Sequence, residues 1–498
     1  MSQLSSSSIN SSNKSDLVAY ALLSGIFILR LIYVSFMGLV PDEAYYWDWS
    51  RNPAFGYFDH PPMVAWLIFL GARIFGTTFL GVKFMAVAGS FFASLCTFYL
   101  AKKYVQKTSS LIILILLSSF VILFGVGGLI ATPDIPMVLF WSIGLLVAHA
   151  FIFDNRRWTW LLLGAVMGCG MLSKYLFGLF IVSLLVFLLY SKEHRRLLFS
   201  KRLWGALLVA FIFFLPNLLW NSRHQWVSVM YQMHHGLGAR EFPHFDFLGE
   251  FIGGQIGVLS IFPFFLLVIA VINEMRFHLN NPRRMFIAAF FILPLAFFTF
   301  SSLQKRVEPN WPCAAYVSGL ILVALLWEEA GLKKVFLRRF ILFSTIISCA
   351  ATAVVLIHVQ TPVLPLPPGK DPTAQIRGWK PWAAAIDSVR VKVDPAESMP
   401  LCTKFYQDAA FLAFYLPDHP GARALRVNSR PTQYSLYEAD AGLRGKKVII
   451  VLPGQDSLPP EFAQRVDGVV KAATVFQSPG RHTHNPYGVF TAVLKTTP

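Results

Sequence analysis

Charged residues are scarce in this chain of 498 residues. Asp, Glu, Lys and Arg together make up 14% of it, whereas hydrophobic residues make up 55%. This balance lies outside the range of water-soluble domains, so lipid surrounds most of the chain. A formal net charge of +17 would suggest nucleic acid as the partner of a soluble protein. Here the basic residues form short clusters between apolar runs, where they orient membrane helices, and nucleic acid is therefore excluded as a partner.

Cysteine and phosphate-binding motifs are also lacking. All but one of the 5 cysteines lie inside apolar runs, and only Cys402 lies in the polar C-terminal part. No pair there can form an intradomain disulfide. The sequence contains no CxxC metal or redox motif and no Walker-type phosphate loop. No cofactor is required by these features, and a divalent metal ion is left as an open alternative.

Apolar runs near the length of a membrane span are abundant. A span needs about 20 mostly apolar residues, and about eleven runs approach that length. They start near Leu17, Thr78, Ser109, Ile135, Trp158, Tyr175, Leu203, Phe251, Met285, Trp311 and Phe340. Basic clusters fall in alternate connections, which the positive-inside rule assigns to the cytoplasm. The sequence thus predicts a polytopic α-helical membrane protein with a cytoplasmic N-terminus and an outward-facing C-terminus.

Two segments depart from regular spans. The apolar block from Trp158 to Tyr190 is broken only by Ser173 and Lys174, and halving it gives unusually short helices. The segment Met63–Phe75 is apolar but too short to cross a bilayer. We therefore expect it to form a helix that lies along the membrane interface.

Composition divides the chain into three parts. Residues 1–16 are rich in Ser and Asn and are expected to be disordered in the cytoplasm. Residues 17–360 form the predicted membrane domain, with outward loops at 41–77 and 222–250. A Pro-rich linker leads into residues 361–498, which have the patterning of a small soluble α/β domain. Within it we expect helices over Trp379–Arg390 and Asp408–Tyr415 and strands over Lys447–Leu452 and Val489–Leu494.

Ionisable residues near the membrane gather in the outward connections. Asp42 and Glu43 directly follow the first predicted span, which places adjacent carboxylates at the depth of the lipid headgroups. The simpler alternative is a helix start, in which Asp42 caps the helix and Glu43 favours the positive end of its dipole. Farther along the loop, Asp59 and His60 precede two prolines. The alternative here is an Asp-capped turn with an exposed His.

Asp134 and Lys174 lie in two very short outward connections. Asp134 either caps the following helix or takes part in chemistry. Lys174 interrupts an apolar block, where it either snorkels towards the interface or binds an anion. Two further outward loops add polar residues, namely His234, His235, Arg240, Lys305 and Glu308.

Acids and cations on one face of a membrane suit the transfer of a sugar from a lipid phosphate. An acceptor hydroxyl needs a carboxylate within hydrogen-bond reach to take its proton. A departing polyprenyl phosphate needs Lys or Arg to stabilise its charge. A diffusible nucleotide sugar is not needed. A transporter would more typically place ionisable residues on broken helices near the bilayer midplane.

At these residues the sequence resembles the integral-membrane glycosyltransferases of family 39, which include protein O-mannosyltransferases and the lipid A aminoarabinose transferase. The resemblance covers about Leu17 to Leu326. It rests on Asp42-Glu43-Ala44-Tyr45-Tyr46-Trp47, Tyr57-Phe58-Asp59-His60-Pro61-Pro62-Met63, Thr132-Pro133-Asp134, Leu172-Ser173-Lys174 and Pro216-Asn217-Leu218-Leu219-Trp220-Asn221. The resemblance implies a GT-C fold, a polyprenyl-phosphate sugar donor and inversion at the anomeric carbon.

The same resemblance implies roles for individual residues. Asp42 matches the carboxylate that activates the acceptor, Asp134 matches a second acid of the cavity, and Lys174 matches a ligand of the donor phosphate. The sequence departs from the aminoarabinose transferase at Asp59-His60, where that enzyme has a Glu-Lys pair before the two prolines. A metal or phosphate role is therefore not transferred to these two residues from the resemblance.

The combined interpretation is a glycosyltransferase of a bacterial inner membrane that uses a polyprenyl-phosphate sugar and acts on a glycan, glycolipid or protein. The alternative is a non-enzymatic exporter or flippase of a lipid-linked saccharide. Such a protein would need a route through the bilayer, and the sequence lacks the paired, Gly- or Pro-broken acidic helices that would form one. We assign catalysis to Asp42, Glu43 and Asp134, donor-phosphate binding to Lys174, Arg240, His60 and Lys305, and substrate or metal contacts to Asp59, His234, His235 and Glu308.

Overall fold

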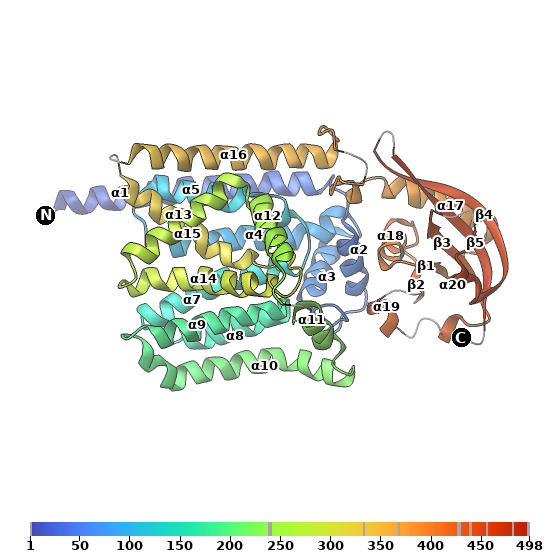
Figure 1. Cartoon of the computed structure of the whole chain (residues 1–498), viewed down its shortest axis with the longest axis horizontal. Coiled ribbons are helices and arrows are strands. Elements are labelled where there is room, and N and C mark those ends of the chain that lie inside the picture. Colours follow the sequence, from blue (N-terminus) through green and yellow to red (C-terminus); the bar gives the residue numbers. More distant parts are fainter. Residues whose placement is uncertain are drawn as a thin grey trace. The chain divides into compact units, whose positions relative to one another are not determined.

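The computed structural model describes residues 2–237, 242–331, 334–366, 369–425, 430–437, 441–454, 457–480 and 483–495. They form two compact units, drawn in Figure 1. The membrane unit comprises Met1–Tyr33, His60–Leu67 and Lys83–Val355. The C-terminal unit comprises Val34–Asp59, Ile68–Val82 and Leu356–Pro498. Most of the segment between α1 and α4 therefore packs with the C-terminal segment.

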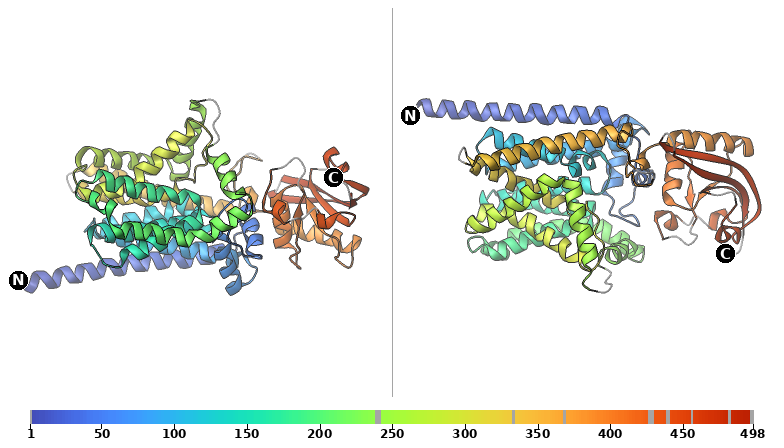
Figure 2. Two further views of the ribbon diagram at one scale, coloured as in Figure 1. Left: turned by 90° about the horizontal axis from the view of Figure 1, so that it is seen from below. Right: turned by 45° about the horizontal axis from the view of Figure 1, so that its top comes forward.

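The membrane unit is built of helices that run roughly side by side (Figure 2). Its α-helices are α1 (Ser2–Val34), α4 (Phe79–Ala101), α5 (Thr108–Phe120), α6 (Ile122–Gly125), α7 (Asp134–Phe153), α8 (Thr159–Ser173), α9 (Gly178–Tyr190), α10 (Lys201–Arg223), α11 (Val227–Leu237), α12 (Phe245–Leu259), α13 (Ile261–Phe277), α14 (Pro282–Ser302), α15 (Cys313–Ala330) and α16 (Val335–Gln360). The 3-10 helices are η1 (Gly127–Leu129), η2 (Tyr175–Phe177) and η3 (Arg195–Phe199).

Two helices bear on predictions made from composition. Helix α3 (Met63–Phe75) has the bounds that the sequence predicts, and it belongs in part to each unit. Its position along the membrane interface stays a prediction. Helix α1 extends back to Ser2, through residues for which disorder is expected. The expected disorder of residues 1–16 stays a prediction.

The membrane-spanning helices are less regular than the sequence predicts. Among the described residues, 7 helices are long and apolar enough to cross a membrane, or up to 9 if each of two bent pairs is one span. Helices α8 and α9 are shorter, as expected for the block that Lys174 divides. The count of eleven spans stays a prediction. The segment predicted as one span near Phe251 is bent, because α12 and α13 meet at 106° at Ser260, a non-glycine residue with φ of 70°.

The bend of 67° between α5 and α6 leaves carbonyl groups outside the regular helical pattern. Arg30 of α1 donates to the carbonyl oxygens of Ser119 at 2.7 Å and Phe124 at 3.1 Å. Thr352 of α16 donates to the carbonyl oxygen of Phe120 at 2.6 Å. Since an unpaired carbonyl in lipid costs several kcal/mol, these two side chains stabilise the break.

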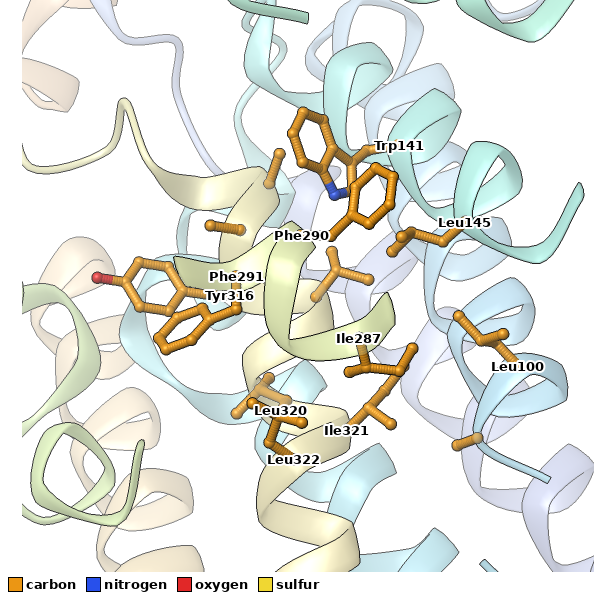
Figure 3. Close-up of a cluster of buried hydrophobic side chains, with 14 of the residues drawn as sticks. Leu100, Trp141, Leu145, Ile287, Phe290, Phe291, Tyr316, Leu320, Ile321 and Leu322 are labelled. Atoms are coloured by element: carbon orange, nitrogen blue, oxygen red, sulfur yellow. The ribbon is translucent and has the colours of Figure 1, made fainter. Parts of the chain in front are cut away.

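Aromatic side chains of three helices form the centre of the membrane unit. Figure 3 shows Trp141 of α7 beside Phe290 of α14, with ring centroids 6.1 Å apart. Phe291 of α14 lies next to Tyr316 of α15, with centroids 5.8 Å apart. All four side chains are almost fully buried. This packing joins α7, which begins at Asp134, to α15, which follows Asn310.

Helices α8 and α10 approach closely through two glycines four residues apart. A Cβ atom on Gly164 would lie 2.5 Å from the carbonyl oxygen of Ala206, and one on Gly168 would lie 2.9 Å from that of Ala210. Small residues at this spacing let helix backbones pack tightly in membranes. The contact holds the end of α8, and thereby the turn with Lys174, against α10.

Gly168→Val should therefore lower the apparent melting temperature of the detergent-solubilised protein. The new side chain would force α8 and α10 apart, which costs about 1–3 kcal/mol for overpacking. Gly257→Val is the matched control, because a Cβ atom on this helical glycine would meet nothing within 4 Å. Equal melting of the two variants would contradict the close approach of α8 and α10.

The C-terminal unit contains a mixed five-stranded sheet with helices. The strand order is β2-β1-β3-β5-β4; β1 is parallel to β2 and β3, and β5 is antiparallel to β3 and β4. Both helices and both strands that the sequence predicts are present. The elements are α2 (Pro41–Ser50), η4 (Ala374–Ile376), α17 (Trp379–Val393), β1 (Leu401–Thr403), α18 (Tyr406–Tyr415), β2 (Arg423–Ala424), α19 (Gln433–Leu436), η5 (Ala441–Leu443), β3 (Lys447–Pro453), α20 (Pro460–Ala463), β4 (Val466–Gly480) and β5 (Thr483–Leu494).

Alternate residues of the central strands form the core of this sheet. Cys402 pairs with Ile450, which pairs with Phe490 of β5, and Val448 pairs with Ala492. These five residues are buried in one apolar cluster, as expected for a sheet whose period-two pattern faces a core. The sheet thus gives α18, which packs on β1 and β2, a rigid support.

Helix α2 carries the Asp42–Trp47 motif and packs against α18. The Tyr45 ring lies 4.5 Å from that of Tyr406, and the Trp47 ring lies 5.1 Å from that of Phe414. Aromatic pairs at such distances contribute about 0.5–1.5 kcal/mol beyond their buried area. The aromatic residues of the motif therefore attach the carboxylates beside them to the C-terminal segment.

Candidate functional site

Asp42 and Glu43 occupy different roles at the start of α2. Val40 is the N-cap residue, and the Glu43 carboxylate accepts a hydrogen bond from its N–H at 3.0 Å. Asp42 Oδ1 instead accepts a hydrogen bond from the Tyr406 hydroxyl at 3.0 Å. The capping role that the sequence suggests for Asp42 is therefore filled by Glu43. The predicted catalytic role of Glu43 stays a prediction.

The environment of Asp42 favours proton acceptance. Asp42 is half-buried, and within the described residues of the C-terminal unit its Oδ2 makes no hydrogen bond. Burial raises the pKa of Asp42, the Tyr406 hydroxyl lowers it, and Asp59 raises it again by charge repulsion. The net direction is upward. A carboxylate with a raised pKa holds a proton more tightly and is a stronger base.

Asp59 is a buried carboxylate that forms an ion pair with Arg430, whose side chain is 41% exposed. Its Oδ1 accepts from Arg430 at 2.6 Å and its Oδ2 from the Tyr45 hydroxyl at 2.9 Å. The Gln433 N–H donates to the Tyr45 hydroxyl at 2.6 Å, and the Gln433 side chain accepts from the N–H of Phe58 at 2.7 Å. A simple Asp-capped turn is therefore not what holds Asp59. Its substrate or metal contact stays a prediction.

Asp134 and Lys174 form an ion pair in the membrane unit. The Lys174 ammonium lies 2.6 Å from Asp134 Oδ1, and the Asn310 amide donates to Asp134 Oδ2 at 2.6 Å. The N-cap of α7 is Pro133, so Asp134 does not cap this helix with its side chain. Lys174 is only 6% exposed, which contradicts snorkelling into water. In this structure Lys174 is paired with Asp134, and its binding of a donor phosphate stays a prediction.

The turn that carries Lys174 is anchored by the Pro216–Asn221 motif. The Tyr175 hydroxyl donates to Asn217 at 3.3 Å or Ser228 at 3.0 Å, and it accepts from Asn221 at 3.2 Å. Asn217 and Asn221 lie one turn apart on α10 and are fully buried. The two amides thus fix the residue next to Lys174, which explains why these polar residues stand in an apolar helix.

Hydrogen bonds from neighbouring helices hold the loop that carries Asn310. Gln255 of α12 donates to the carbonyl oxygen of Pro309 at 3.2 Å, and the Tyr316 hydroxyl donates to Gln255 at 2.7 Å. The loop therefore presents Asn310 towards Asp134 from a fixed position. Asp134, Lys174 and Asn310 come from three separate connections between helices.

A cavity of about 240 Å³ in the membrane unit reaches this cluster. Asp134 and Asn310 contribute to its lining, and Arg30 contributes a second charged group. Val138, Val317 and Leu320 are among the side chains that make the rest largely apolar. The cavity therefore combines apolar walls with a few charged or amide groups, a composition that is typical of ligand pockets.

The remaining predicted site residues are placed as follows. Lys305 donates to the backbone carbonyl oxygen of His234, so these two residues meet. Glu308 is exposed and His60 is half-buried in the membrane unit. The side chain of His235 and the whole of Arg240 lie outside the described residues. Among the described residues no group of three or more His, Cys, Asp and Glu could hold a metal ion.

Sequence reasoning missed the residues that bind the loop carboxylates. Tyr406 and Arg430 lie far from Asp42 and Asp59 along the chain, with a separation of 364 residues for the Tyr406 bond. Neither residue stands in a motif. No local pattern could have found them, because the contacts depend on the packing of α2 against α18.

The matches to known proteins agree with this architecture. Residues 59–220 match the family model described as dolichyl-phosphate-mannose-protein mannosyltransferase. The fold is similar to that of ArnT from Cupriavidus metallidurans, with a TM-score of 0.63 and 15% identity, over 96% of this chain and 98% of that one. ArnT bound to undecaprenyl phosphate gives a TM-score of 0.64 at 14% identity, over 94% of this chain and 97% of that one. The predicted resemblance is confirmed. This multi-pass membrane protein has a GT-C fold.

Several curated relatives of this GT-C protein are named as sugar transferases. The lipid A galacturonosyltransferase RgtD of Rhizobium johnstonii is 25% identical over 61% of this chain and 64% of its own length. An undecaprenyl phosphate-alpha-4-amino-4-deoxy-L-arabinose arabinosyl transferase of Pseudomonas fluorescens is 32% identical over 40% of this chain and 39% of its own length. The chain thus spans less than two thirds of these relatives.

Lys174→Met should destabilise the protein strongly. It would leave the Asp134 carboxylate, whose side chain is 15% exposed, without its cationic partner, and breaking a buried pair costs about 3–5 kcal/mol. The measurement is the apparent melting temperature in detergent. Adding Asp134→Asn to the Lys174→Met variant should recover most of the loss, because it removes the unpaired charge. Wild-type melting of the single variant would contradict the pair.

Proposed function

We propose that this chain is an integral-membrane glycosyltransferase that moves a sugar from a polyprenyl phosphate to a hydroxyl group at the outer face of a bacterial inner membrane. The main support for this proposal is the environment of Asp42. Its Oδ1 accepts a hydrogen bond from Tyr406, and its Oδ2 makes no hydrogen bond within the described C-terminal unit. The named activities of the relatives support an undecaprenyl-phosphate donor. They also favour a glycolipid acceptor such as lipid A over a protein.

In the proposed reaction the acceptor hydroxyl donates a hydrogen bond to Asp42. As the acceptor oxygen attacks the anomeric carbon, Asp42 takes its proton. The bond between that carbon and the phosphate oxygen breaks, and the phosphate leaves with the electron pair. This single displacement inverts the anomeric carbon. The charge on the departing phosphate needs a cation, and Lys174, Lys305, His60 and Arg240 are the residues we propose for it.

The other acids have supporting roles in this proposal. Asp134 holds Lys174 and Asn310 through both of its carboxylate oxygens. A donor phosphate that binds Lys174 would compete with Asp134 for the ammonium group. Glu43 caps the start of α2, and Asp59 forms an ion pair with Arg430. Asp42 is therefore our candidate for the base.

Asp42→Asn should lower transfer by a factor on the order of a hundred, because an amide cannot accept the proton of the hydroxyl. The measurement is mass spectrometry of lipopolysaccharide, glycolipids and glycoproteins from a deletion strain complemented with either form at matched expression. Asp467→Asn is the control, since this carboxylate is 71% exposed. Full complementation by Asp42→Asn would move the base to Asp134, and an unchanged glycan profile in the deletion strain would contradict the proposed function.

A reporter that is active only in the cytoplasm should be silent when fused after Pro498. This orientation follows from about eleven spans and from the basic clusters, which the positive-inside rule assigns to the cytoplasm. The same reporter fused to the connection between α9 and α10 should be active, which provides the control. Strong activity of the C-terminal fusion would contradict the proposed topology.

A further inference from the structure

The C-terminal segment supplies two side chains to the loop carboxylates. The Tyr406 hydroxyl at the start of α18 donates to Asp42, and Arg430 donates to Asp59. The Arg430 guanidinium also lies 5.1 Å from the centroid of the Tyr406 ring. The phenol and the guanidinium are therefore in contact with each other as well as with one acid each.

Tyr45 contacts both Tyr406 and Asp59. Its ring packs on Tyr406 at 4.5 Å between centroids, and its hydroxyl donates to Asp59 at 2.9 Å. Tyr45 itself lies on α2, one turn after Asp42. A shift of Tyr406 or Arg430 would therefore change the surroundings of both acids together.

A purely structural explanation accounts for only part of this arrangement. The Arg430–Asp59 pair satisfies a carboxylate that is only 4% exposed, and it would be needed in any stable fold. Tyr406 is different, because Asp42 is half-buried and its carboxylate is not used to cap α2. A phenol that binds such a carboxylate orients it without being required to satisfy it.

We propose that Tyr406 and Arg430 are positioning residues, which orient the Asp42 carboxylate and stabilise its negative charge. Their importance for sugar transfer rests on the proposed function. Their effect on Asp42 does not, since the titration of this carboxyl group can be followed without any substrate. The C-terminal segment is then part of the reaction site rather than an appended domain.

The groups around Asp42 determine the direction in which its pKa shifts when Tyr406 or Arg430 is replaced. In the C-terminal unit, Tyr406 and Arg430 lower the pKa of Asp42, whereas burial, Asp59 and Glu43 raise it. Loss of the Tyr406 hydroxyl therefore raises this pKa further, and the carboxylate form then requires a higher pH. Other titratable groups on or beside α18 face elsewhere: Asp408 binds Tyr487, Tyr415 binds the N–H of Leu39, and His419 packs on Trp47.

Infrared difference spectroscopy of the purified full-length protein tests the proposal. The carboxyl signal of Asp42 is identified by its loss in Asp42→Asn. This reference is needed because burial also raises the pKa of Asp408, to about 7. In Tyr406→Phe the titration of Asp42 should move to higher pH by on the order of one unit. Arg430→Gln should move it in the same direction, and Arg430→Lys should restore part of the shift.

Tyr487→Phe is the matched control, because it removes the same kind of phenol bond from Asp408 and should leave the titration of Asp42 unchanged. An unshifted Asp42 in Tyr406→Phe would overturn the proposal, as would equal shifts in Tyr406→Phe and Tyr487→Phe. In the complemented deletion strain, transfer by Tyr406→Phe should recover as the external pH rises. A shifted titration without any transfer by the wild type would overturn the proposed function alone.

Discussion

A carboxylate that leaves water must keep a partner, because an isolated charge in a protein interior costs several kcal/mol. Asp59 and Asp134 meet that requirement with side chains from elsewhere in the sequence. Asp134 is paired with Lys174, 40 residues away, and Asp59 with Arg430, 371 residues away. These pairs hold the short connections of the membrane unit and the loop after α2 in place. The distribution of acids thus determines which segments must meet.

The same requirement applies to the backbone of the membrane unit. Every irregular point leaves polar groups that lipid cannot satisfy. Arg30 and Thr352 bind the carbonyl groups at the break after α5, and Asn217 and Asn221 hold the turn beside Lys174. These polar residues of apolar helices therefore lie at the breaks. Since ligand pockets need polar groups among apolar walls, it is at these breaks that the membrane unit can offer chemistry.

The sequence could predict the acids and Lys174 as candidate site residues, because a charged residue beside an apolar run is visible in the local sequence. The C-terminal helices and strands were predictable for a similar reason, since their periodicity is local. The partners were not predictable, because the bond from Tyr406 to Asp42 depends on how α2 packs against α18. Nor was the bend at Ser260, where a residue other than glycine adopts a positive φ. Whether Asp42 or Glu43 caps α2 depends on which of them stands at position N3 of the helix. Composition does not reveal this position.

The free oxygen of Asp42 separates it from the other acids. Both oxygens of Asp134 accept bonds, from Lys174 and Asn310, and both oxygens of Asp59 accept bonds as well. A carboxylate bound in this way loses its existing partners if it takes a proton. Asp42 is bound through Oδ1 alone within the described C-terminal unit, so its Oδ2 can accept a proton while Tyr406 keeps it in place. A general base needs this combination of one fixed and one available oxygen.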